Sequence, residues 1–175
     1  MSTETTGAAT PAEHNRTVAR RWIDAFNARD DAAEMASRTT DYIAHPPDSI
    51  QTATLDSDAW SSSSASSSRA SPTCTSRCRA PAADEGMTAQ RILFTGTHTG
   101  NFRGLPPTGG NVRFSDIEIN RMVDVKVAEH WFQLDSVTLF EQLGLRIVPG
   151  PRLLPRLLAS PVTRLLGKRR RTVRS

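Results

Sequence analysis

Four side chains in this sequence could transfer protons from strand ends or turns: Asp135, His130, His98 and His45. A carboxylate can remove a proton from the carbon beside a carbonyl group when an apolar pocket raises its pKa toward neutral pH. Asp135 and His130 fall in one predicted strand, and alternation places them on opposite faces. Because Trp131 shares the face of Asp135, we expect these two side chains to line the same pocket.

Each candidate also has a purely structural interpretation. Asp135 stands just before a predicted helix, where the helix dipole favours a negative charge. His130 is explained equally well as a buried hydrogen-bonding residue, and His45 and His98 lie where polar residues are common. Asn27, a further candidate for substrate contact, most simply caps the end of the first helix. The residue types alone leave these alternatives open.

The elements that would position these groups begin with an amphipathic helix over residues 11–27. The run Thr-Pro-Ala-Glu at residues 10–13 supplies a capping hydroxyl, a proline at the first helical position and a glutamate at the third. Val18, Trp22 and Phe26 then recur at every fourth residue and form one apolar stripe. We expect Trp22 and Phe26 to belong to the core.

A shorter helix and three long strands are predicted to follow, over residues 31–39, 90–98, 111–123 and 126–135. Three strands in succession predict an antiparallel meander, so the fold class is α+β. In the middle strand the apolar residues change from even to odd positions near Ser115 and Asp116, which predicts a β-bulge that curves the sheet. In the turn before the last strand, the β-branched Val125 resists the positive φ that a tight hairpin requires.

The length and charge of the chain predict one domain with flanking tails. We expect a core domain over residues 11–146, a disordered start over residues 1–10 and a basic tail rich in Leu, Arg and Pro over residues 147–175. Nine Lys and Arg residues follow Glu141, and subtracting them from the net charge of +4 leaves −5 for the rest of the chain. A nucleic-acid partner is therefore not expected, whereas the tail predicts weak contact with membranes or anionic partners.

Two further features restrict the function classes. The sequence has neither a long apolar stretch nor an apolar signal segment, which predicts a cytoplasmic protein. Cys74 and Cys78 lie in one Ser-rich run without a second pair, so they suggest neither a disulfide framework nor a metal site.

Residues 61–83 differ from their surroundings because they contain no Leu, Ile, Val or Phe and are dominated by Ser, Ala, Arg, Thr and Pro. One interpretation is a disordered linker. The other is a shifted reading frame, since TCN serine codons read one base out become NTC, which encodes Phe, Leu, Ile or Val. That frame gives an apolar helix followed by a strand. We expect the segment as written to be irregular.

Several motifs together resemble the SnoaL-like polyketide cyclase family, whose bacterial members are often called ester cyclases. They are Thr-Gly-Thr-His-Thr-Gly at residues 95–100, Gly-Leu-Pro-Pro-Thr-Gly at 104–109, Glu-His-Trp at 129–131, Gln-Leu-Gly at 142–144 and Ala-Phe-Asn-Ala-Arg-Asp at 25–30. The resemblance implies a cone-shaped curved antiparallel sheet with N-terminal helices, as in nuclear-transport-factor-like and cystatin-like proteins. It also implies a homodimer.

The resemblance further implies intramolecular aldol chemistry on a polyketide-like or small apolar carbonyl compound, without a metal or an organic cofactor. Asp135 would be the acid/base, with His130 as a second catalytic candidate. Trp131, His45, His98 and Asn27 would contact the substrate. Two alternatives stay open, namely a non-catalytic binding module of the same fold and a damaged, inactive copy. The second is favoured by Val125, because the family usually has glycine at this position of the turn.

The reading-frame hypothesis predicts a difference in stability. The alternative frame supplies large apolar side chains that each contribute about 1.5–3 kcal/mol on burial. We therefore expect a frame-restored protein to unfold at a higher temperature than the chain as written, and to bind and react where the latter does not. Calorimetry on both proteins tests this, and equal unfolding temperatures contradict it. Resequencing the coding DNA tests the frame itself.

Overall fold

A computed structural model describes residues 9–146, 148, 150–153 and 155–156 of this protein. The chain divides into two compact units, Met1–Gly144 and Leu145–Ser175. The first unit holds every assigned element, in the order α1 Pro11–Ala28, α2 Asp31–Ala36, β1 Arg38–His45, α3 Ser57–Ala70, β2 Thr75–Cys78, β3 Ala82–Ala83, β4 Met87–Thr97, β5 Asn111–Val123, β6 Lys126–Leu134 and α4 Ser136–Gln142.

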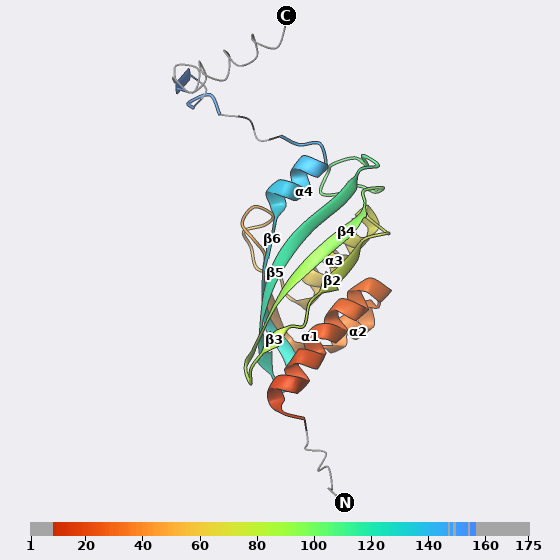
Figure 1. Ribbon diagram of the computed structural model, residues 1–175, viewed down its shortest axis with the longest axis vertical. Coiled ribbons are helices and arrows are strands. Elements are labelled where there is room, and N and C mark those ends of the chain that lie inside the picture. The colour runs from red at the N-terminus through yellow and green to blue at the C-terminus, as the bar shows by residue number, and fades with distance from the viewer. Residues whose placement is uncertain (1–8, 147, 149, 154, 157–175) are drawn as a thin grey trace, which may run out of the picture. The chain divides into compact units, whose positions relative to one another are not determined.

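The strands form one curved, unclosed sheet in the order β1-β6-β5-β4-β2, with β3 also pairing with β4 (Figure 1). The predicted meander is confirmed, because β4, β5 and β6 are antiparallel neighbours. β1 lies parallel to β6 at one edge. The α+β fold class is therefore confirmed, with the N-terminal helices packed on one face of the sheet.

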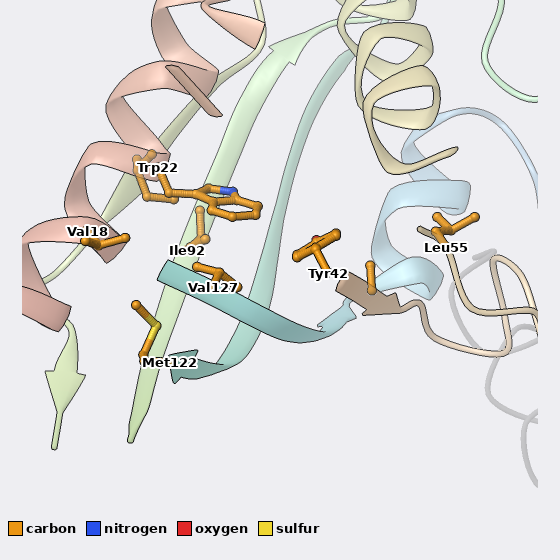
Figure 2. Close-up of a cluster of buried hydrophobic side chains, with 9 residues drawn as sticks. Val18, Trp22, Tyr42, Leu55, Ile92, Met122 and Val127 are labelled. Carbon is orange, nitrogen blue, oxygen red and sulfur yellow. The ribbon is translucent and has the colours of Figure 1, made fainter. Parts of the chain in front are cut away.

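Helix α1 begins as its sequence predicts and packs through its apolar stripe. Thr10 and Glu13 form a reciprocal capping box, and Pro11 occupies the first turn. Val18 and Trp22 then enter the main core cluster, whose other members include Tyr42, Ile92, Met122 and Val127 (Figure 2). This cluster joins α1 to the inner face of the sheet, the face that the helices cover.

The predicted β-bulge at Ser115 and Asp116 is wrong. The register between β4 and β5 runs without a shift from Met87 to Thr97. The irregularity lies in the pairing of β5 with β6, where Ala128 of β6 is the extra residue opposite Arg121 and Met122. The apolar residues of β5 switch from even to odd positions because some of them lie on each face of the sheet. Ile117 and Ile119 are on the uncovered outer face, 54% and 40% exposed, while Asp116 and Glu118 are buried on the inner face.

The expectation that residues 61–83 are irregular is also wrong, since they contribute to α3 and form β2 and β3. No Gly or Pro interrupts α3, and serine is only a moderately poor helix former. Asp56 caps the helix by accepting a hydrogen bond from the Ala59 N–H. Pro72 follows directly after the C-cap, where a helix must end.

A buried ion pair holds the start of α3 in place. Arg38 donates to Glu34 at 2.8 Å, and both side chains are almost completely buried. Arg38 also donates to the Ser57 carbonyl oxygen and to the Ser61 hydroxyl, while the Trp60 indole N–H donates to Glu34 at 2.6 Å. These contacts join α2, β1 and α3, and they compensate the desolvation of both charges.

The tail cannot be compared with its prediction. Most of residues 147–175 lie outside the described residues, so membrane or anionic contact stays a prediction, as do the cytoplasmic location and the disorder expected over residues 1–10. Among the described helices, none has both the length and the apolar character needed to cross a membrane.

The turn between β5 and β6 places two non-glycine residues in the left-handed region, Asp124 at φ 48° and Val125 at φ 59°. Left-handed backbone costs an L-residue about 1–2 kcal/mol, and a β-branched side chain tolerates it poorly. The strain anticipated from the sequence is therefore present at Val125.

Replacing Val125 with glycine should relieve this strain. We expect Val125→Gly to raise the free energy of unfolding by about 1 kcal/mol, measured by urea denaturation. The matched control is Val123→Gly, which changes the same residue type at an extended strand position and should lower stability. A decrease in stability for Val125→Gly would contradict the interpretation.

Candidate functional site

An apolar cavity of about 170 Å³ lies between the inner face of the sheet and helices α1, α3 and α4. Its surface is mostly apolar, with serines of α3 on one side and an aromatic group formed by Trp22, Trp60, Phe26, Phe94, Phe114 and Phe132. Phe94 stacks on Phe114 and receives the edge of Phe26. Dry cavities of roughly 150 Å³ accept a benzene-sized guest, so this one suits a compound of about one ring.

Two carboxyl groups from β5 open into this apolar space. Asp116 and Glu118 are two residues apart on the inner face of the strand, and each is 5% exposed. Asp116 accepts a hydrogen bond from the Gln133 backbone N–H at 3.0 Å, and Glu118 accepts one from the Gln90 amide at 2.7 Å. Neither forms an ion pair with any residue that the structure describes.

Burial changes the protonation of this carboxyl pair. Desolvation raises the pKa of Asp116 to about 7, against the opposing effect of the Gln133 and Ile117 backbone N–H groups. Desolvation also raises the pKa of Glu118 to about 8, with a further contribution from the negative charge of Asp116. Near pH 7 the pair therefore offers an acid and a base in the same cavity.

Asp135, the acid/base candidate from the sequence, lies outside the cavity lining. Asp135 is exposed and caps α4, accepting hydrogen bonds from the Thr138 backbone N–H at 3.0 Å and the Thr138 hydroxyl at 2.7 Å. These bonds hold the pKa of Asp135 below its ordinary value. Asp135 does not line the cavity, so the expectation of a desolvated carboxyl there is not met.

The assignment of faces on β6 has to be reversed. Phe132 and Leu134, which share the parity of His130, line the cavity, whereas Trp131 does not. Trp131 instead stacks on His45 with ring centroids 4.9 Å apart, and His45 lies 3.2 Å from the Glu129 carboxylate. The structure thus brings His45 and Trp131 together, but away from the cavity.

His130 and Asn27 hold structural positions. His130 is fully buried, with its ring against Trp22 and Trp60. Desolvation lowers its pKa to about 3, so the imidazole is neutral at pH 7. Asn27 accepts from the Ser76 N–H and donates to the Ser76 carbonyl oxygen, which ties α1 to β2. The cap of α1 is Arg29, not Asn27 as predicted.

His98 does line the cavity, at the end of β4, and is 2% exposed. Of the residues singled out in the sequence for catalysis or substrate contact, it alone belongs to the cavity wall. Within the described residues, no group of three or more His, Cys, Asp or Glu side chains could hold a metal ion. Cys74 and Cys78 are both free thiols.

Comparisons with known proteins identify the family. The model of the SnoaL-like polyketide cyclase family matches residues 16–143. The chain belongs to this family. None of the curated proteins compared with it matches the chain.

Solved structures of SnoaL-like proteins share the fold. AclR from Streptomyces galilaeus, a candidate hydroxylase, is 26% identical, with a TM-score of 0.67 over 74% of this chain and 95% of its own. IdmH from Streptomyces antibioticus, a candidate polyketide cyclase, is 25% identical, with a TM-score of 0.67 over 75% and 99%. A SnoaL-like protein from Jannaschia sp. CCS1 has a TM-score of 0.71 over 81% and 99% at 15% identity, which shows the fold alone.

Sequence reasoning missed the two carboxyls that this SnoaL-like protein places in its cavity. Apolar residues usually mark the inner face of a strand, but in β5 Ile117 and Ile119 lie on the exposed outer face. A constant two-residue period starting from Val112 would have placed Asp116 and Glu118 on the inner face. The informative feature is therefore the constant alternation of faces along β5, not the positions of its apolar residues.

The raised pKa values predict how stability depends on pH. As pH rises from about 4.5 to about 8, the unfolded chain releases the Glu118 proton while the native protein retains it, so native stability falls. Glu118→Gln cannot ionise and should remove this loss. We expect its stability relative to the original protein to grow by roughly 3 kcal/mol between pH 5 and pH 8.

Urea unfolding at both pH values measures this difference. Asp135→Asn is the control, because a lowered pKa leaves Asp135 ionised in both states over this interval. A Glu118→Gln protein with the same pH dependence as the original would show that Glu118 is not a buried neutral acid.

Proposed function

We propose that this SnoaL-like protein catalyses acid/base chemistry without a cofactor on a small, largely apolar carbonyl compound, of the intramolecular aldol type. The observation that carries the proposal is the pair Asp116 and Glu118, two buried carboxyls without an ion-pair partner among the described residues, at an aromatic-walled cavity. A carboxyl with a pKa near 7 is suited to abstract and return protons at neutral pH.

Asp116 is the proposed base. Its carboxylate takes a proton from the carbon beside one carbonyl group, and the resulting enolate carbon attacks a second carbonyl carbon of the same molecule. One carbon–carbon bond forms, the π bond of the second carbonyl breaks, and its oxygen becomes an alkoxide. That alkoxide takes a proton from the pair, so the carboxyls end with the protons they began with. Exclusion of water by the aromatic walls strengthens these interactions.

Glu118 is the proposed acid, because its pKa of about 8 keeps the proton on it at pH 7. Gln90 fixes its orientation by donating to Oε2, so the Glu118 side chain cannot turn freely. The neighbouring Glu34 is not proposed for this role because its Oε1 already accepts hydrogen bonds from Arg38 and Trp60.

The test uses a probe that fits the cavity, 2,6-heptanedione, whose intramolecular aldol reaction closes a six-membered ring. Because residues 61–83 form regular elements and the cavity is present, this proposal replaces the inactivity expected from the sequence. We expect the original protein to accelerate ring closure and Asp116→Asn to lower the rate by about 10²-fold or more. Asn keeps the size of the side chain and its acceptor for the Gln133 N–H, so unfolding is not the expected cause of the loss.

Asp135→Asn is the decisive comparison, because resemblance to the family points to Asp135 as the acid/base and the cavity points to Asp116. Retained activity in Asp135→Asn with loss in Asp116→Asn supports the proposal. The reverse result moves the chemistry to Asp135. Binding of the probe without turnover, unchanged in both variants, identifies a non-catalytic binding module.

A further inference from the structure

His98 lines the cavity and has one ring nitrogen without a hydrogen-bond partner among the described residues. The side chain is 2% exposed and forms part of the cavity wall. Its Nε2 atom is buried and has no hydrogen-bond partner among the residues that the structure describes. A buried donor or acceptor without a partner is costly, and such groups in native proteins usually have a specific reason.

The loop after β4 fixes which nitrogen of His98 carries the proton. The Thr108 backbone N–H donates to Nδ1 at 3.3 Å, and a backbone N–H can only donate. The Thr108 hydroxyl oxygen lies 3.1 Å from the same nitrogen and accepts from the Gly110 N–H, which leaves its own hydrogen for Nδ1. Nδ1 is therefore the acceptor, and the neutral ring carries its proton on Nε2.

Hydrogen bonds to the loop hold the His98 backbone in place. Its own backbone is bonded on both sides, with His98 N–H donating to the Gly110 carbonyl and Gly109 N–H donating to the His98 carbonyl, each at 2.9 Å. The Phe102 ring stands perpendicular to the imidazole at 6.5 Å. These backbone bonds and the Thr108 contacts at Nδ1 tie His98 to the loop without a ligand.

We propose that His98 is a specificity-determining residue whose Nε2–H donates a hydrogen bond to a carbonyl oxygen of the cavity ligand. The ligand class is a small compound with one carbonyl oxygen on an otherwise apolar, ring-sized body, since most of the cavity surface is apolar. The inference rests on the proposed function for its site, but it concerns binding and requires no turnover.

The proposal is tested by comparing two probes of nearly the same shape, acetophenone and α-methylstyrene. Acetophenone has a carbonyl oxygen where α-methylstyrene has a methylene group. Isothermal titration calorimetry should show that the full-length protein binds acetophenone about tenfold more tightly. His98→Phe keeps a ring at this position but removes the donor, so it should bind both probes with similar affinity. His45→Phe changes a histidine that does not line the cavity, and it should keep the preference.

NMR on the unmodified protein gives a second readout that does not depend on how the variant folds. Long-range ¹H–¹⁵N spectra should show a protonated Nε2 and an unprotonated Nδ1 at His98, with the Nε2 signal shifting on addition of acetophenone and not of α-methylstyrene. A proton on Nδ1, or an equal preference in the original protein and His98→Phe, overturns the proposal. Asp116→Asn should keep the ketone preference while losing ring closure, so failure of one proposal is distinguishable from failure of the other.

Discussion

The unbroken two-residue alternation along β5 is the constraint on which the cavity depends. Its even positions place Val112, Phe114, Asp116 and Glu118 on the covered face, and its odd positions leave the isoleucines on the uncovered one. A slip of one residue would exchange these sets, exposing the carboxyls and filling the cavity with aliphatic side chains. The continuous pairing with β4 over eleven residue pairs makes such a slip costly.

The cavity contains carboxyl groups in two electrostatic conditions. Glu34 has a guanidinium and an indole N–H as partners and serves as an anchor for α3. Asp116 and Glu118 have only backbone or amide donors, and burial therefore favours their neutral forms. Carboxyl groups of one cavity thus include one that is paired with the cation of Arg38 and two that have no ion-pair partner among the described residues.

Local signals in the sequence predict α1 and the meander, but neither α3 nor the site. The capping box at Thr10 and the alternating runs of β4 to β6 are determined within a few residues, so α1 and the meander were predicted with nearly correct ends. Helix α3 was not, because its stability comes from Arg38 and Glu34, which are distant in the sequence. Tertiary contacts of this kind override a weak local propensity.

The candidate site shows the same division between local and distant information. The exposed isoleucines of β5 make its inner face hard to assign from the sequence. Asp135 stands at the end of a strand, and the structure uses that position to cap α4. Only His98, fixed by a loop a few residues away, was both singled out and found at the cavity. Residues whose role depends on which face is covered could not be assigned before the packing was known.

The parallel pairing of β1 with β6 has a consequence for the order of folding. Ala44 pairs with His130, so β1, apart from its bridge to Leu55, has no partner strand until almost the whole domain has left the ribosome. Contacts between such distant residues close slowly, because the loop entropy must be lost before they form. Until then β1 is an unpaired edge that carries the exposed Ile43, and the nascent chain is most vulnerable to aggregation there.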